Sequence, residues 1–316
     1  MTSKFLMTLC AAAMLTACGA KSEETKASDS PAVKSVSAGT QPSDNKGDAL
    51  MQALAGQDEA MQARYGARHP GETLRFFEIT PGMTVAEALP GGGWYSKILL
   101  DYLGPEGELI GLDYAMEMWP NFSFMTADRL KAKETWPEDW VEDAQEWRSE
   151  NSANVSAATF STIPESTNGQ VDAVLFIRAL HNLARFEEAG NYLTDAARAS
   201  YDMLKPGGIV GVVQHRAPES HSDEWASGNN GYLKESYVIK TFEEAGFTLV
   251  ARSEVNANAL DRPSEEDIVW RLPPSLATTR PSEDDAADIA ASKAATRAKL
   301  QAVGESDRMT LKFRKN

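Results

Sequence analysis

Three consecutive glycines, Gly91, Gly92 and Gly93, separate an apolar run from an amphipathic run in the stretch TVAEALPGGGWYSKILLDYLG at residues 84–104. The apolar run predicts a buried strand, and the amphipathic run predicts a helix. Because glycine has no Cβ, the turn between them can adopt unusual backbone angles and let a ligand approach the main chain. The unpaired N–H groups at the start of the helix favour an anionic ligand group. The stretch therefore indicates an α/β fold with a ligand-binding loop.

The rest of the chain alternates strands with helices. Strands are predicted at residues 83–89, 108–113, 155–160, 171–177, 209–215, 247–255 and 308–315. Helices are predicted at residues 49–65, 71–79, 94–104, 185–204 and 234–245. This alternation predicts a doubly wound, mostly parallel sheet with helices on both faces and an antiparallel C-terminal strand. Ligands of such sheets bind beyond the carboxyl ends of the strands. The Trp-rich, charged stretch 114–151 predicts helix only in part.

The N-terminus predicts export. Lys4 precedes an apolar run over residues 5–17, which is too short to span a bilayer and suits a signal peptide ending at residue 17. The run ends at Cys18 in a stretch that resembles the bacterial lipobox, which implies lipidation of Cys18. An ordinary secretory signal with an incidental cysteine is the alternative. Gly19 after the cysteine implies onward sorting to the outer membrane, on the periplasmic side of the envelope.

A polar segment follows the expected lipid anchor. Residues 18–47 are rich in Ser, Ala, Lys, Thr and Pro and predict a flexible tether, so we expect the folded domain at 48–316. Cys18 would be the only cysteine after cleavage, which excludes a disulfide and a cysteine-based metal site. The net charge of −15 argues against nucleic-acid and anionic-lipid partners. Membrane contact is expected only through the lipid anchor.

The glycine loop fits two classes of ligand. Asp113 ends the next predicted strand, where a carboxylate can accept hydrogen bonds from ribose hydroxyls. A dinucleotide loop reads Gly-x-Gly-x-x-Gly, but Ser96 stands at the third glycine. An S-adenosyl loop reads acid-x-Gly-x-Gly-x-Gly; Glu87 matches its acid, and Leu89 replaces its first glycine. A structural turn without a ligand is the third interpretation.

The sequence resembles class I S-adenosylmethionine-dependent methyltransferases over residues 72–315. Besides the loop and Asp113, two stretches carry the resemblance: 171–183, an apolar strand that ends in His-Asn, and 201–213, which contains Lys-Pro-Gly-Gly before a strand. A narrower likeness to a bacterial subgroup of exported predicted methyltransferases is carried by residues 69–99, 214–220, 252–276 and 304–315. The resemblance implies the Rossmann-like class I methyltransferase fold, with S-adenosylmethionine as cofactor.

The resemblance also implies residue roles. The residues expected to contact the cofactor are Glu87, Gly91, Gly92, Gly93, Tyr95, Asp113 and Thr159. Glu87 would lie near the methionine end, the glycines would bring the main chain against the cofactor, and Asp113 would hold the ribose. An acid often found near the adenine is missing, and Thr159 occupies that part of the chain.

Polar side chains after the fourth and fifth predicted strands are candidates for the reacting face. Arg178, His181 and Asn182 follow the fourth strand, and His215 and Arg216 follow the fifth. Methyl transfer is an in-line displacement that needs alignment and sometimes a base, and a histidine titrates near neutrality. We expect catalytic roles for His181, Asn182 and His215. The alternative for His181 and Asn182 is that they cap the following helix or satisfy backbone groups. The alternative for His215 and Arg216 is a structural ion pair.

Aromatic residues flank the expected site. Trp94 and Tyr95 can pack on the cofactor or a substrate ring, or simply between helix and sheet. Trp270 is expected in a lid or at an edge. No spacing of His, Asp and Glu is typical of a zinc or calcium site, so no metal is expected.

Three functions remain open on the sequence. The leading hypothesis is a methyltransferase acting on a small molecule of unknown identity, on a lipid-anchored envelope protein. The alternative is a non-catalytic module of the same fold that binds a nucleoside or other small metabolite in the periplasm, since S-adenosylmethionine is made in the cytoplasm. A nicotinamide-dependent oxidoreductase is disfavoured by Ser96.

Overall fold

The computed structural model describes residues 42–316, with the elements that follow. The strands are β1 (Thr84–Ala88), β2 (Glu108–Asp113), β3 (Asn154–Thr159), β4 (Val171–Ile177), β5 (Leu204–Ala217), β6 (Leu233–Lys234), β7 (Phe247–Ser253) and β8 (Arg308–Lys315). The α-helices are α1 (Pro42–Ala55), α2 (Glu59–Gln62), α3 (Tyr65–Arg68), α4 (Pro70–Phe76), α5 (Trp94–Leu103), α6 (Ala127–Lys133), α7 (Trp136–Trp147), α8 (Leu180–Arg185), α9 (Glu187–Gly190), α10 (Tyr192–Met203), α11 (Glu235–Glu244) and α12 (Ala287–Val303). Short 3₁₀ turns are η1 (Met116–Asn121), η2 (Glu165–Thr167), η3 (Val269–Arg271) and η4 (Ala277–Thr279).

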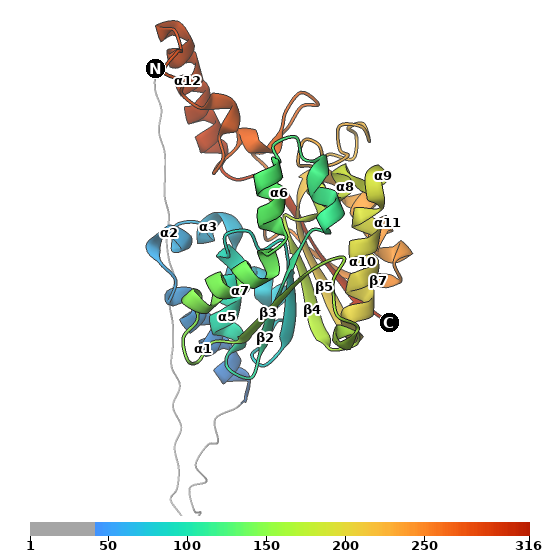
Figure 1. The fold of residues 1–316 in the computed structure, drawn as a ribbon. Coiled ribbons are helices and arrows are strands. Elements are labelled where there is room, and N and C mark those ends of the chain that lie inside the picture. The colour runs from blue at the N-terminus through green and yellow to red at the C-terminus, as the bar shows by residue number, and fades with distance from the viewer. Residues whose placement is uncertain (1–41) are drawn as a thin grey trace, which may run out of the picture. The chain divides into compact units, whose positions relative to one another are not determined.

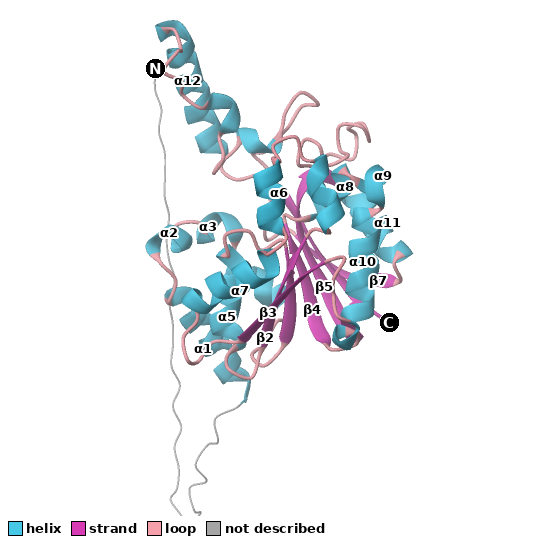
Figure 2. Cartoon of the chain, viewed as in Figure 1, coloured by secondary structure: helices cyan, strands magenta, loops and turns pink. Residues whose placement is uncertain are grey.

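One sheet organises the domain, and its main strand order is β3-β2-β1-β4-β5-β8-β7 (Figures 1 and 2). Strands β1 to β5 pair in parallel, whereas β8 runs antiparallel to both β5 and β7. The predicted doubly wound, mostly parallel sheet with an antiparallel C-terminal strand is confirmed. Because the strand order reverses between β1 and β4, the loops that follow these strands meet at a switch point where α/β sheets bind ligands.

Both faces of the sheet are buried beneath helices. In β1, Val85 belongs to the core that includes α1, α4, α5 and α7, whereas Ala86 belongs to the core that includes α8, α10 and α11. In β2, Leu109 belongs to the first of these two cores and Ile110 belongs to the second. Figure 1 shows α5 and α7 on one side of the sheet and α10 and α11 on the other. Burial on both faces explains why the central strands read as nearly continuous apolar runs.

The N-terminal helices differ from the prediction. The helix expected at 49–65 is broken into α1, α2 and α3. The break follows Gly56, and Asp58 caps α2 by accepting a hydrogen bond from the N–H of Met61 at 2.8 Å. Helix α1 begins at Pro42, six residues before the expected domain start at Asp48, so the tether does not extend to residue 47.

Two later predictions were also wrong in extent, and one helix was missed. The helix expected at 185–204 is instead α9 and α10, which follow the end of α8 at Arg185, and Asn191 adopts a left-handed φ of 54° at the junction between α9 and α10. Strand β5 begins at Leu204 and includes the Lys-Pro-Gly-Gly stretch that was expected as a turn. Helix α12 was not predicted; it has no buried residue, and its apolar periodicity is weak. The stretch 114–151 is helical in part, as predicted, through η1, α6 and α7.

The expected signal peptide, the Cys18 lipidation site and the tether up to residue 41 lie outside the described residues. Within 42–316, none of the helices is both long enough and apolar enough to cross a bilayer.

Candidate functional site

The glycine loop connects β1 to α5 through three left-handed residues. Leu89, Gly91 and Gly93 have φ angles of 55°, 55° and 75°. The N–H of Leu89 donates to the carbonyl of Leu112 at 2.7 Å, which ties the loop to β2. Leu89 therefore adopts the backbone conformation that a glycine favours, at the position where the S-adenosyl loop has its first glycine. The departure in sequence therefore still places a left-handed residue at this position.

The three glycines differ in their surroundings. A Cβ built on Gly91 would come no closer than 4.0 Å to an atom beyond its chain neighbours, and one on Gly92 would meet nothing within 4 Å. A Cβ on Gly93 would lie 2.4 Å from the ring of Trp147 in α7. Gly91 and Gly92 thus leave the main chain open to approach, while Gly93 lets a tryptophan pack against the start of α5.

Glu87 is buried beneath the loop. It is 3% exposed and accepts a hydrogen bond from the hydroxyl of Ser96 at 2.6 Å. Burial raises the pKa of Glu87 to about 7, although the bond from Ser96 opposes the shift. Ser96, which stands in place of the third glycine of the dinucleotide pattern, therefore donates a hydrogen bond to Glu87, the acid of the S-adenosyl pattern.

Asp113 ends β2 beside the loop and is 5% exposed. Its Oδ2 accepts a hydrogen bond from Lys133 Nζ of α6 at 2.8 Å, and its Oδ1 accepts one from the N–H of Tyr114 at 2.9 Å. Burial raises the pKa of Asp113 above its ordinary value, although the charge of Lys133 opposes the rise. A single lysine thus holds a nearly buried carboxylate at the carboxyl edge of the sheet.

A cavity of about 480 Å³ joins the loop, Asp113 and the residues after β4. It is lined by Leu89, Pro90, Gly91, Asp113, Tyr114, Trp119, Phe122, Phe124, Lys133, Trp136, Arg178, Asn182, Arg185 and Trp270. The structure brings together Gly91, Asp113 and Asn182, which were predicted from three distant stretches. Trp270, expected in a lid or at an edge, lines the same cavity.

The aromatic wall of this cavity was not predicted. The rings of Tyr114 and Trp119 lie 5.0 Å apart at 66°, and Phe122 lies 5.3 Å from Trp119. Lys133 Nζ lies 4.0 Å from the centroid of Trp119 and 5.7 Å from that of Trp136. These residues come from the stretch 114–151, where the only signal was a density of tryptophans in charged sequence.

The two histidines lie behind the lining rather than in it. His181 and His215 are 7% and 9% exposed, with their rings 5.6 Å apart. His181 Nδ1 lies 3.5 Å from Gln214 Nε2, and His215 Nδ1 lies 2.6 Å from Ser306 Oγ. Burial lowers the pKa of His181 to about 4 and that of His215 well below its ordinary value. Both imidazoles are therefore neutral near pH 7.

The other predicted residues also lie outside the lining. Tyr95 is 4% exposed, and its ring packs against Trp94 at 5.0 Å between helix and sheet. The hydroxyl of Thr159 lies 2.9 Å from that of Thr162 within its own turn. Arg216 forms ion pairs with Glu254 at 2.7 Å and with Asp307 at 2.9 Å, which is the structural role considered for it. Glu87, Gly92 and Gly93 are not among the residues that line the cavity.

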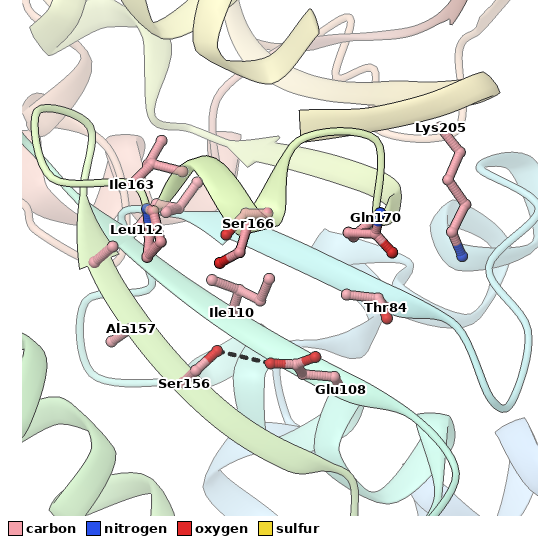
Figure 3. A pocket seen from close by; sticks show the side chains of 13 residues that line it. Thr84, Glu108, Ile110, Leu112, Ser156, Ala157, Ile163, Ser166, Gln170 and Lys205 are labelled. Atoms are coloured by element: carbon pink, nitrogen blue, oxygen red, sulfur yellow. Dashed lines mark hydrogen bonds between the residues drawn. The ribbon is translucent and has the colours of Figure 1, made fainter. Parts of the chain in front are cut away.

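A second cavity, of about 450 Å³, lies against β2 and β3 (Figure 3). Thr84, Glu108 and Lys205 place one end of it at the amino ends of β1, β2 and β5. Ser156 donates a hydrogen bond to Glu108 at 2.8 Å there. None of the predicted site residues lines this cavity, so the candidate site is the one at the carboxyl edge. Within residues 42–316 no three His, Cys, Asp or Glu side chains are grouped to hold a metal ion.

Comparison with known proteins finds no matching family model and no matching curated protein. Solved structures are similar in fold. They include a SAM-dependent methyltransferase from Aquifex aeolicus (17% identity, 66% of this chain and 93% of that chain, TM-score 0.41). They also include the [4+2]-cyclase SpnF (16% identity, 84% of this chain and 91% of that chain, TM-score 0.48). A third is the 1,6-didemethyltoxoflavin-N1-methyltransferase of Burkholderia thailandensis, with bound 1,6-didemethyltoxoflavin and S-adenosylhomocysteine (12% identity, 89% of this chain and 93% of that chain, TM-score 0.42).

The fold assignment rests on the chain's own topology. The parallel strands β1 to β5, the antiparallel β8 placed between β5 and β7, and the glycine loop directly after β1 occur together. The mostly parallel sheet, the antiparallel C-terminal strand and the glycine loop after the first strand are what the sequence resemblance implied, whereas the place of β8 in the strand order was not predicted. The protein has the Rossmann-like fold of class I S-adenosylmethionine-dependent methyltransferases.

Proposed function

We propose that the protein is an S-adenosylmethionine-dependent methyltransferase that acts on a small molecule. One observation carries the proposal: Gly91 after β1, Asp113 at the end of β2 and Asn182 in α8 after β4 line a single cavity. Its volume of about 480 Å³ lies within the range of small-ligand sites. Since unrelated functions share this fold, the site rather than the fold supports the activity.

The residues present fit the cofactor. Gly91 leaves the main chain open to approach, and the carboxylate of Asp113 is placed to accept ribose hydroxyls at the end of β2. The rings of Tyr114 and Trp119 offer an apolar surface for a base. When bound, S-adenosylmethionine supplies an electrophilic methyl group on a sulfonium.

The chain's own contribution to the reaction is alignment and exclusion of water. The aromatic residues and Trp270 line the same cavity as Asp113, so they can exclude water from it. Asn182 can orient an acceptor by hydrogen bonding, since it lines the cavity at the start of α8. His181 and His215 are buried outside the lining and have lowered pKa values, so the proposed reaction assigns neither of them the role of base.

The envelope location belongs to the same proposal. The apolar run before Cys18 supports export and lipid anchoring, with the domain on the periplasmic side of the outer membrane, as in the exported methyltransferase subgroup that the sequence resembles. The intact mass of the protein purified from membranes tests it. A mass that begins at an acylated Cys18 supports the anchor, and an unmodified terminus contradicts it.

Calorimetric titration of the full-length protein with S-adenosylmethionine and S-adenosylhomocysteine tests the cofactor. We expect micromolar binding that Asp113→Ala abolishes. Asp195→Ala removes an aspartate that pairs with Arg198 on the exposed face of α10, and it should leave binding unchanged. No binding of either compound at millimolar concentration would contradict the proposed function.

One observation favours the non-catalytic alternative, a metabolite-binding module of the same fold. The cavity lining contains no histidine and no cysteine, and His181, the expected base, lies outside it with a pKa of about 4. Release of S-adenosylhomocysteine from S-adenosylmethionine, measured over a panel of small acceptors, separates the two functions. Binding without release for every acceptor, anionic ones included, would favour the module.

A further inference from the structure

Arg178 is the first residue after β4, and its backbone is strained. Its φ angle is 59°, a left-handed conformation that arginine rarely adopts. Its N–H donates to the carbonyl of Val213 at 2.6 Å, which fixes this conformation against β5. The side chain is half-buried and lines the cavity. Among residues 42–316 no hydrogen bond or ion pair satisfies its guanidinium.

Three further arginines lie behind Arg178 and share one carboxylate. Arg68 Nε and Arg308 Nη1 lie 3.3 Å and 3.4 Å from Glu305, and Arg64 also pairs with Glu305. Arg68 and Arg308 are each 3% exposed. Burial lowers the pKa of Arg178, and the positive charge of Arg308 adds to the effect. Four guanidinium groups against one carboxylate leave an excess of positive charge at this wall.

Arg185 adds a second unpaired guanidinium to the same cavity. It is the last residue of α8, its Nε is buried without a hydrogen-bond partner in the described chain, and its guanidinium carbon lies 4.9 Å from the ring of Phe186. The only acid in the lining is Asp113, which Lys133 already pairs. The cavity is therefore cationic in a chain whose net charge is −15.

A structural role alone does not explain this arrangement. Arginines that only support a fold are paired when they are buried, because an uncompensated charge in a low dielectric is destabilising. Arg178 is unpaired, faces a cavity and is held in a strained conformation. Strain of this kind persists where the surrounding structure enforces it, and it is concentrated at binding sites.

We propose that this cavity binds a small anion, a carboxylate or phosphate ester, whose charged group is held by Arg178 and Arg185. The planar fork of a guanidinium matches both oxyanions with two parallel hydrogen bonds. Trp270 lines the cavity with these arginines and offers a ring surface for the carbon skeleton of the ligand. The assignment of this anion as the methyl acceptor rests on the proposed function, whereas anion binding itself does not.

Calorimetric titration of the full-length protein with benzoate, phenyl phosphate and the uncharged benzamide tests the proposal. We expect at least one anion to bind about tenfold or more tightly than benzamide, as ionic hydrogen bonds to a guanidinium provide. The stronger of the two anions identifies the preferred oxyanion. Equal affinities for the anions and benzamide, or no binding at 10 mM, would overturn the proposal.

Variants locate the anion. Arg178→Gln and Arg185→Gln should each weaken anion binding by about tenfold and leave benzamide unaffected. Arg198→Gln, an arginine on the exposed face of α10, should change neither affinity. If one of the two cavity variants fails to fold in a thermal scan, the other still decides. Unchanged affinity in a folded Arg178→Gln or Arg185→Gln would remove that arginine from the site.

The two proposals fail separately. Titration with S-adenosylhomocysteine accompanies each anion titration. Anion binding without S-adenosylhomocysteine binding would keep the anion site and contradict the methyltransferase. S-adenosylhomocysteine binding without anion binding would keep the cofactor site and contradict an anionic acceptor.

Discussion

Asp113 and Lys133 form an ion pair at the end of β2, with Oδ2 and Nζ 2.8 Å apart. The carboxylate is nearly buried, and the lysine also lies over the ring of Trp119. Burial raises the pKa of Asp113, and the lysine limits that rise. Lys133 therefore favours the ionised form of the carboxylate, which accepts hydrogen bonds from ribose hydroxyls.

Lys133→Met should make cofactor binding depend on pH. Without the ammonium group the pKa of Asp113 rises further, so protonation reaches the carboxylate at a higher pH. Over a pH series from alkaline to acid, we expect the affinity for S-adenosylhomocysteine to begin falling at a higher pH in the variant than in the wild type. Calorimetry over this range measures it, with Asp113→Asn as the control whose residual binding does not titrate. Identical pH profiles for variant and wild type would contradict this role of Lys133.

Glu87→Gln should change how stability depends on pH. The folded pKa of Glu87 is about 7 and the ordinary value is 4.5, so the folded state holds a proton that the unfolded chain releases. The stability that the protonated Glu87 side chain contributes is fully present below pH 4.5 and is lost as the pH rises through 7. At pH 8 the ionised acid destabilises the fold by about 3 kcal/mol, and Gln should restore much of that. Denaturant unfolding at pH 5 and pH 8 measures the difference.

The controls for Glu87→Gln follow from the structure. His181 has the opposite slope, because its folded pKa of about 4 lies below the ordinary 6.5, and its contribution is lost as the pH falls through that window. His181 is present in both proteins, so its contribution cancels in the difference between their free energies of unfolding. Glu108 is half-buried and also accepts a hydrogen bond from a serine, Ser156 (Figure 3), so Glu108→Gln is the matched control. Equal effects of both substitutions at pH 8 would contradict the assignment to Glu87.

Leu89→Gly should be more stable than Leu89→Ala. Both variants lose the contacts of the leucine side chain with the core, but only glycine relieves the left-handed φ of 55°. We expect a difference of about 1 kcal/mol in the free energy of unfolding in favour of glycine. Ala88→Gly, one residue earlier in β1, should instead destabilise, since a strand residue gains nothing from glycine. Glycine less stable than alanine at position 89 would show that the strain is absent.

Local patterns predicted the elements that position the site. The bounds of β4 and β8 agree with the predicted strands, because an apolar run and a strict alternation are each set within a few residues. The glycine loop and Asp113 were found for the same reason. Ser96 was recognised only as a missing glycine, since its bond to Glu87 depends on how α5 packs against β1.

The rest of the site depends on contacts between distant parts of the chain. Lys133 and Trp136 reach the cavity because of how α6 and α7 pack, and no spacing in the sequence encodes that. The arginines around Glu305 come from α3, from the segment before it and from the start of β8, so their charges meet only in the folded chain. His181 lies in α8 after β4, and His215 lies within β5 rather than after it; the sequence could not show that Gln214 and Trp270 would pack around His181.

Arg178→Asn should stabilise the ligand-free protein. Asparagine tolerates the left-handed φ of 59° better than arginine, and the substitution removes a charge that neighbouring arginines repel. We expect a gain of about 1 kcal/mol in the free energy of unfolding, as relief of such strain provides. Urea denaturation measures it, and the gain should shrink at high salt because the repulsion is screened.

Arg308→Gln is the contrasting substitution. Arg308 is buried, donates to the carbonyl of Ala67 at 2.5 Å and pairs with Glu305, so its removal should destabilise the protein by more than about 1 kcal/mol. A gain in the free energy of unfolding in Arg178→Asn together with a loss in Arg308→Gln would indicate that Arg178 serves a ligand and that Arg308 stabilises the fold. A loss of stability in Arg178→Asn as large as that in Arg308→Gln would instead assign Arg178 to structural support. The anion bound in the cavity would then have to be held by Arg185 alone.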